Sequence, residues 1–76
     1  MSHLPIITAL ANTLRDNRGL PPYPDITPAT HLRTDLGLDS LDLAELTVRL
    51  EKETGVDVFK EGIVNTVGEV LERLGE

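Results

Sequence analysis

With 76 residues and a net charge of −6, the chain is long enough for one small domain, residues 1–76, and too short for a second core or an enclosed enzyme cleft. The absence of cysteine excludes disulfides, thiolate catalysis and cysteine-based zinc sites, and a single Phe and a single Tyr leave an aliphatic core. No apolar run reaches membrane-spanning length, and "MSHLPII" lacks the pattern of a signal peptide. We therefore expect a cytoplasmic protein without membrane insertion.

Negative charge is concentrated in the middle of the chain, where residues 35–57 hold seven of the 13 acidic residues. This distribution argues against a nucleic-acid partner and favours a basic protein surface. A solvated helix face that only keeps the domain soluble is the alternative, and the charge count alone favours it.

The first predicted helix is "LPIITALANTLRDNRG", in which apolar residues recur at helical spacing. Pro5 suits its first turn and Gly19 suits its end. The following segment, "LPPYPDITPATHLRTDLGL", holds four prolines and must be a long loop. We expect six apolar residues to fix this loop to the core: Leu20, Tyr23, Ile26, Leu32, Leu36 and Leu38.

The second helix is predicted to begin at Asp39 or Ser40, with Asp39 as a suitable N-cap, and to end near Thr54 before Gly55. A short helical piece is expected over residues 59–64. Thr66 and Glu69 form a capping-box pattern at the start of the last helix. The sequence thus predicts an all-α fold, a small bundle of three principal helices plus one short helix, with a long loop between the first and second helices.

The second helix carries two apolar stripes on opposite sides, since successive residues turn by about 100°. One side is a core stripe of Leu43, Leu46 and Leu50. A bundle this small should bury only one face, so the second stripe is expected to be exposed and to serve as a protein-docking surface. That second stripe consists of Leu41, Ala44 and Val48, with Glu45, Lys52 and Glu51 at its sides. The alternative is that Leu41 or Ala44 packs under the long loop.

Ser40 stands at one end of this second stripe, and its ordinary role would be a helix cap. A catalytic serine would need a base and an oxyanion site, and neither His3 nor His31 is placed in a suitable motif. Metal binding is not indicated either, because the acids after Asp35 lack the glycine and final glutamate of a calcium loop. A third possibility is modification, because a phosphodiester on Ser40 would meet free backbone N–H groups and the positive end of the helix dipole.

The segment "DLGLDSLD", followed by Glu45 and Leu46, resembles the signature of the acyl carrier protein family, and the similarity extends over the whole chain. The resemblance implies that Ser40 carries 4'-phosphopantetheine, transferred from coenzyme A by a separate phosphopantetheinyl transferase. The arm's thiol would hold acyl groups as thioesters. The chain departs from the family's usual pattern in its Arg49 and Lys52, in a short "FKEGIVN" segment and in a proline-rich loop.

We therefore expect a free-standing, monomeric and non-catalytic carrier in a fatty-acid-like, polyketide or other specialised pathway. Its partners would be the transferase and acyl ligase, acyltransferase or synthase enzymes with basic docking surfaces. The expected partner-binding residues are Asp39, Leu41, Asp42, Ala44, Glu45, Val48, Arg49 and Glu51. The alternative function is a helical protein-interaction module without a prosthetic group.

Overall fold

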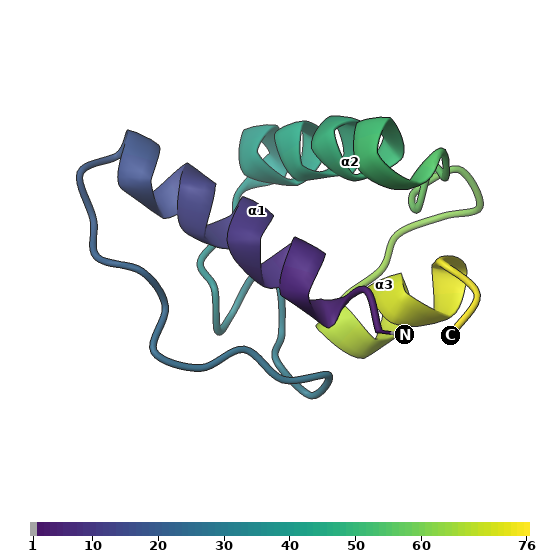
Figure 1. Cartoon of the computed structure of the whole chain (residues 1–76), viewed down its shortest axis with the longest axis horizontal. Coiled ribbons are helices and arrows are strands. Elements are labelled where there is room, and N and C mark those ends of the chain that lie inside the picture. The colour runs from purple at the N-terminus through teal and green to yellow at the C-terminus, as the bar shows by residue number, and fades with distance from the viewer. Residues whose placement is uncertain (1) are drawn as a thin grey trace.

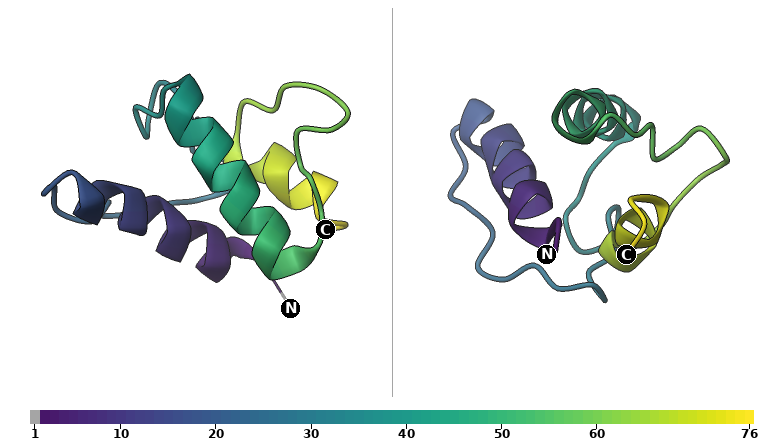
Figure 2. Two further views of the ribbon diagram at one scale, coloured as in Figure 1. Left: turned by 90° about the horizontal axis from the view of Figure 1, so that it is seen from above. Right: turned by 45° about the vertical axis from the view of Figure 1, so that its right-hand side comes forward.

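Three α-helices form the regular secondary structure of residues 2–76, the part of the chain described by the computed structural model. They are α1 (Leu4–Asn17), α2 (Ser40–Thr54) and α3 (Val67–Arg73). α1 packs against both other helices (Figure 1), and Figure 2 shows α2 crossing α1 obliquely. Within these residues no strand forms, and one isolated bridge joins His31 to Thr66. The predicted all-α fold is confirmed.

The ends of α1 and α2 follow local signals in the sequence. Pro5 lies in the first turn of α1, where its missing N–H removes no helical hydrogen bond. Asp39 is the N-cap of α2, and Gly55 ends that helix in the left-handed conformation with φ 77°. The predicted limits of both helices are therefore confirmed.

The core lies where the inner faces of the three helices meet, and its buried residues are aliphatic. Helix α1 contributes Ile7, Ala11 and Leu14, and α2 contributes Leu43, Leu46 and Leu50. Helix α3 adds Val67, Val70 and Leu71. The predicted core stripe of the second helix is confirmed.

The predicted short helix over residues 59–64 is wrong, since this segment forms a turn. Two hydrogen bonds span it, from Lys60 N–H to the Asp57 carbonyl (3.3 Å) and from Gly62 N–H to the Phe59 carbonyl (3.2 Å). Gly62 has φ 128°, which is incompatible with a continuing right-handed helix. Buried Val58 and Val64 anchor the two ends of the segment instead.

The long loop is ordered by its contacts with the core and with the start of α3. Ile26, Leu32, Leu36 and Leu38 are buried, and the hydroxyl of half-buried Tyr23 donates to the Leu36 carbonyl. Leu20 is exposed, so the prediction that it fixes the loop is wrong. Gly19, with φ 71°, turns the chain at the end of α1, and the Leu20 side chain stays in solvent.

Carbonyl groups of the same loop accept hydrogen bonds from the first backbone N–H groups of α3. Val67 donates to Thr30 at 2.9 Å and Gly68 donates to Pro28 at 2.8 Å. These N–H groups have no acceptor within their own helix, so the loop supplies what the helix lacks. A Cβ atom at position 68 would lie 2.9 Å from the Pro28 oxygen, which explains the glycine.

The cap of α3 differs in one bond from the predicted capping box. Thr66 Oγ1 accepts a hydrogen bond from Glu69 N–H at 3.1 Å, as expected. The Glu69 carboxylate, however, accepts from Asn65 N–H at 3.1 Å rather than from Thr66. The reciprocal capping box is found instead at the start of α2, between Asp39 and Asp42.

Candidate functional site

Ser40 is the first residue of α2 and its side chain is exposed. The helix cap is the preceding residue, because Asp39 Oδ1 accepts the backbone N–H of Asp42 at 2.8 Å. The interpretation of Ser40 as the cap is therefore wrong. Among residues 2–76, no histidine or carboxylate forms a hydrogen bond with the Ser40 hydroxyl. The geometry thus presents a serine hydroxyl to solvent at a fixed helix start without a base to activate it.

Asp42 completes the cap and is joined to the end of α1. Its Oδ2 accepts the backbone N–H of Asp39 at 3.1 Å, and its Oδ1 accepts from Arg18 at 2.6 Å. Asp42 is only 5% exposed. The expectation that Asp42 offers its carboxylate to partners is therefore wrong, since the capping box and Arg18 occupy both of its oxygens. This link from α1 holds the helix start that presents Ser40.

The Asp39 carboxylate remains ionised to lower pH than usual. The backbone N–H of Asp42 lowers the pKa of Asp39 below its ordinary value of 3.8, and the Asp42 side chain and the positive charge of Arg18 act in the same direction. Arg18 lies 3.8 Å from the Asp39 carboxylate. The start of α2 therefore carries a negative charge beside Ser40 at neutral pH.

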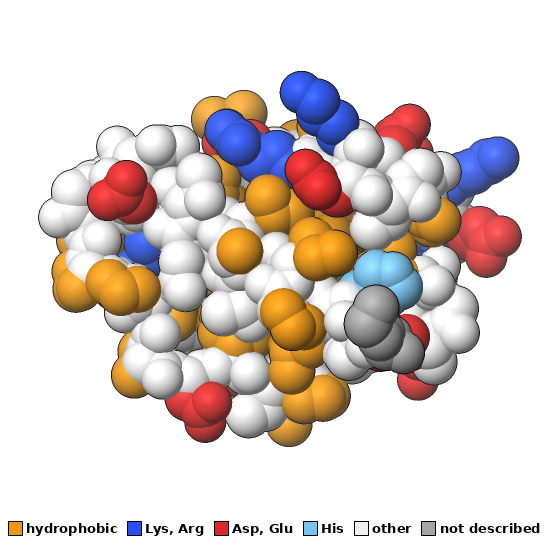
Figure 3. Space-filling model, in the orientation of Figure 1, with side chains coloured by type: hydrophobic (Ala, Val, Ile, Leu, Met, Phe, Trp, Pro, Cys, Tyr) orange, Lys and Arg blue, Asp and Glu red, His pale blue; other side chains and the backbone are white. Residues whose placement is uncertain are grey.

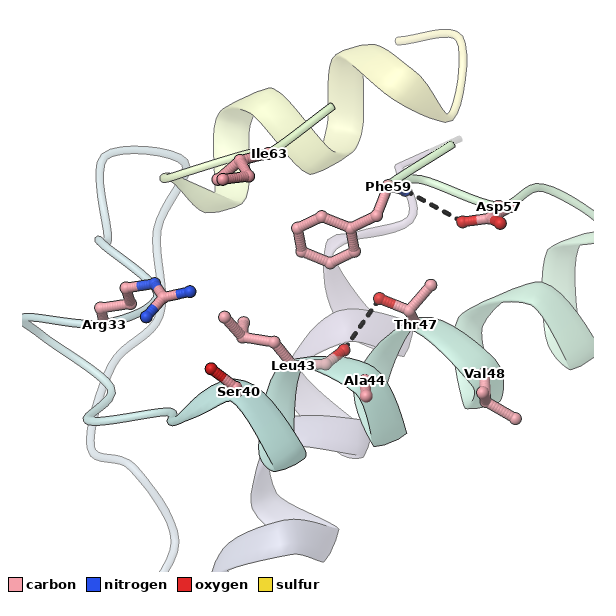
Figure 4. A pocket seen from close by; sticks show the side chains of 9 residues that line it. All are labelled: Arg33, Ser40, Leu43, Ala44, Thr47, Val48, Asp57, Phe59 and Ile63. Carbon is pink, nitrogen blue, oxygen red and sulfur yellow. Dashed lines mark hydrogen bonds between the residues drawn. The ribbon is translucent and has the colours of Figure 1, made fainter. Parts of the chain in front are cut away.

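A pocket of about 430 Å³ opens beside Ser40, between α2 and the segment that follows it (Figure 4). Leu43, Ala44, Thr47 and Val48 form its α2 side. Phe59 and Ile63 face them from the turn segment, and Arg33 closes the end nearest Ser40. Arg33, Phe59 and Ile63 were not predicted from the sequence as site residues. No sequence pattern near Ser40 predicts these three residues, because the pocket forms only when the fold brings together three separate segments of the chain.

The second apolar stripe of α2 is exposed as predicted. Leu41 is 80% exposed and Val48 is 66% exposed, and Ala44 between them is also exposed. The alternative that Leu41 or Ala44 packs under the long loop is therefore wrong.

The charged residues beside this stripe are partly paired. Arg49 Nη2 lies 3.1 Å from Glu45 Oε1, one helical turn away, and Glu51 is exposed. Figure 3 shows acidic and basic side chains interspersed along the edge where α2 lies in Figure 1. The α2 surface therefore combines exposed apolar side chains with charge of both signs, and it is less acidic than the sequence count indicates.

Residues 2–76 contain no group of three acidic or histidine side chains placed to hold a metal ion. Within the same residues, none of the helices combines the length and the apolar character needed to cross a membrane.

The fold and the site define a class of small helical proteins that present one serine at the start of a helix with an exposed apolar face. Residues 8–74 match the family described as "Phosphopantetheine attachment site". The chain is 39% identical over 74 residues to an acyl carrier protein of Saccharopolyspora erythraea, a match covering 95% of this chain and 77% of the relative. It is 32% identical over 73 residues to acyl carrier protein 2 of Ralstonia nicotianae, covering 93% of this chain and 89% of the relative.

The chain therefore belongs to the phosphopantetheine-attachment family and functions as an acyl carrier. Its prosthetic group is 4'-phosphopantetheine, and its role is that of a carrier rather than a catalyst. Family membership also implies that it interacts with a phosphopantetheinyl transferase and with acyl-handling enzymes.

Proposed function

We propose that Ser40 is the residue that carries the 4'-phosphopantetheine arm. The observation that supports this assignment most directly is the exposed Ser40 hydroxyl at the first position of α2, at the rim of the pocket. The hydroxyl is accessible to a transferase without any movement of the core, and within the described residues 2–76 no side chain forms a hydrogen bond with it. When bound, the arm supplies a thiol that holds acyl groups as thioesters.

The residues around Ser40 fit an esterified group at this position. The capping box fixes the backbone on both sides of Ser40, so a transferase meets a preformed helix start. The Oγ atom would form a new bond to the phosphorus of coenzyme A that bears the pantetheine, while the bond from that phosphorus to the adenosine bisphosphate breaks. The serine proton is transferred to the transferase or to water, because residues 2–76 provide no base in contact with the hydroxyl.

We also propose that partner proteins dock on the exposed stripe of α2. Leu41, Ala44 and Val48 supply an apolar contact area, and an exposed apolar patch with a charged border suits a protein partner. The proposed acidic contacts are Asp39, Glu45 and Glu51, and Arg49 would influence the partner through its ion pair with Glu45. Asp42 is excluded because it is buried against Arg18.

The α2 surface fits partner enzymes of a specialised acyl pathway best. Arg18 and Arg49 pair with Asp42 and Glu45, so fewer free carboxylates remain than in a uniformly acidic helix. Enzymes that recognise the carrier would then depend on apolar contacts as well as on basic side chains. A cytoplasmic location and a monomeric state stay predictions from the sequence.

Incubation with coenzyme A and a phosphopantetheinyl transferase, followed by intact-mass measurement, tests the assignment of Ser40. We expect the natural chain to gain the mass of one arm and Ser40→Ala to gain none while keeping its helical circular dichroism. Ser2→Ala is the matched control, because Ser2 and Ser40 are the two serines of the chain, and this variant should be modified normally. If the Ser40→Ala variant still gains the arm, another hydroxyl is the site.

A further inference from the structure

Arg33 differs from Arg18 and Arg49 in having no acidic partner among residues 2–76. Arg18 pairs with Asp42 and Arg49 pairs with Glu45, whereas Arg33 belongs to none of the ion pairs found in this part of the chain. Arg33 and Ser40 line the same end of the pocket, and Figure 4 shows the guanidinium pointing from the loop into the pocket on the side of Ser40. A positive charge therefore faces the modification position.

The backbone that carries Arg33 is held firmly beside the helix start. The Arg33 carbonyl accepts from Gly37 N–H at 3.0 Å, and the Arg33 N–H donates to His31 Nδ1 at 3.3 Å. Leu32, the preceding residue, is completely buried and donates to the Asn65 carbonyl at 2.8 Å. The position of Arg33 relative to Ser40 is thus set by the core and not by a free loop.

An anion attached to Ser40 would find few other positive partners. The carboxylates of Asp39 and Asp42 already accept the backbone N–H groups of Asp42 and Asp39 at the start of α2. These acids also place negative charge next to Ser40, which opposes a second anion there. The expectation from the sequence that a phosphodiester would meet free N–H groups is therefore only partly met, and a side-chain cation would add an attraction that the helix start lacks.

A guanidinium is well suited to this need, because its planar N–H groups can donate two parallel hydrogen bonds to a phosphate. We propose that Arg33 binds the phosphodiester of the arm on Ser40 and so directs the first part of the arm into the pocket. This inference rests on the proposed modification of Ser40. The occupant of the pocket is then the carrier's own arm, which would lie against Leu43, Phe59 and Ile63.

Because Arg33 is exposed, its ion pair with the phosphodiester would form in contact with water. A hydrogen-bonded ion pair in water is weak and is screened over about 8 Å at physiological salt. The contact therefore biases the arm toward the pocket without fixing it there, and a partner enzyme can withdraw the arm at little cost.

The phosphorus-31 resonance of the holo carrier tests the contact, since the arm holds the only phosphorus atom of the loaded protein. The natural chain, Arg33→Gln, Arg33→Lys and Lys60→Gln are each loaded with the arm, and loading is checked by intact mass. Lys60→Gln is the matched control, because Lys60 is exposed and lies outside the Ser40 pocket, and its replacement removes the same charge. The amide resonances of a pantetheine unit labelled with nitrogen-15 report the mobility of the arm.

We expect Arg33→Gln to move the phosphorus resonance and to increase the mobility of the arm, while Lys60→Gln leaves both unchanged. Arg33→Lys should give an intermediate result, because it keeps the charge and loses the paired donors. In the natural chain, the guanidinium resonance of Arg33 should shift when the arm is attached.

If Arg33→Gln changes the phosphorus resonance no more than Lys60→Gln does, the contact is refuted even though loading succeeds. A natural chain that takes up no arm would refute the proposed modification of Ser40 instead. The two failures are therefore distinguished by the mass measurement that precedes the spectra.

Discussion

Asp42 stabilises the start of α2 with both of its carboxylate oxygens, one bound to Asp39 N–H and the other to Arg18. A buried carboxylate is stable only when its oxygens accept hydrogen bonds, and here a cation supplies one of them. At the scale of single residues, this carboxylate connects the C-terminal end of α1 to the residue before Ser40. The position of Ser40 therefore depends on the contact between Arg18 and Asp42, which lies away from the exposed face of α2.

Replacing Asp42 by Ala should lower the free energy of unfolding by roughly 2–4 kcal/mol, the combined size of a capping interaction and a hydrogen bond to a charged group. Urea denaturation monitored by circular dichroism measures this change. Glu53→Ala is the control, because Glu53 is an exposed acid of the same helix and its loss should change stability by less than about 0.5 kcal/mol. Equal small effects in the two variants would show that the Arg18 contact does not persist in solution.

The capping carboxylate of Asp39 predicts a loss of stability in acid. Its pKa is lower in the folded chain than in the unfolded chain, chiefly because it accepts the N–H of Asp42. A depressed pKa adds stability above the ordinary value of 3.8, and this stability disappears as the pH falls through the folded value. We expect the urea midpoint of the natural chain to fall more steeply below about pH 4 than that of Asp39→Asn, which has no such proton to gain. Parallel curves for the two proteins would argue against the cap as a source of acid sensitivity.

At the scale of the element, α2 has two apolar faces, of which one packs in the core and the other is exposed. Leu46 is 1% exposed and contacts the core, whereas Val48 lies on the exposed stripe beside the pocket. A helix in a three-helix domain cannot bury both faces, so one of them stays exposed, and we propose that this face binds a partner.

Truncating the two faces should therefore have opposite consequences. Leu46→Ala leaves a cavity in the core and should cost roughly 2–5 kcal/mol of stability. Val48→Ala should change stability by less than about 0.5 kcal/mol, because the side chain is exposed, and it should weaken partner binding instead. Thermal melts and titration with a phosphopantetheinyl transferase measure both quantities. Similar melting temperatures for the two variants would contradict the assignment of Leu46 to the core and Val48 to the exposed face.

At the scale of the whole molecule, acidic and basic side chains lie next to one another on the surface of α2. Glu45 and Arg49 form a pair at one-turn spacing, while Asp39 and Glu51 are exposed. Long-range attraction of a basic partner comes from the net negative charge and acts mainly on the association rate.

Higher salt should slow the modification of the carrier by its transferase, mainly by raising KM, because exposed charges are screened beyond about 8 Å at physiological ionic strength. Glu45→Lys should mimic this effect at low salt and leave the fold intact. Arg49→Ala removes the cation that neutralises Glu45, so it should leave modification unchanged or make it faster. Steady-state kinetics at two salt concentrations measures these effects. Loss of modification in Arg49→Ala would instead identify Arg49 as a direct contact of the partner.

The three helices, the Asp39 cap and the core face of α2 follow from the sequence alone. Each depends on residues within a few positions of one another: Pro5 and Gly55 at helix ends, Asp39 at a cap, and leucines at helical spacing. The motif around Ser40 also consists of neighbouring residues, so its resemblance to a carrier motif is visible without a structure. Residues 59–64 could not be predicted in this way, because Val58 and Val64 decide their path through burial.

Tertiary structure alone decides what surrounds Ser40. Arg18 reaches Asp42 across 24 positions of the chain, and Arg33 and Phe59 reach the pocket from separate segments on either side of α2. The path of the long loop brings Arg33 to this place, and that path is set by buried leucines and by the hydrogen bonds that α3 requires from loop carbonyls. These contacts are absent from any local pattern, because they form only when the whole chain buries its apolar residues and satisfies its backbone groups together.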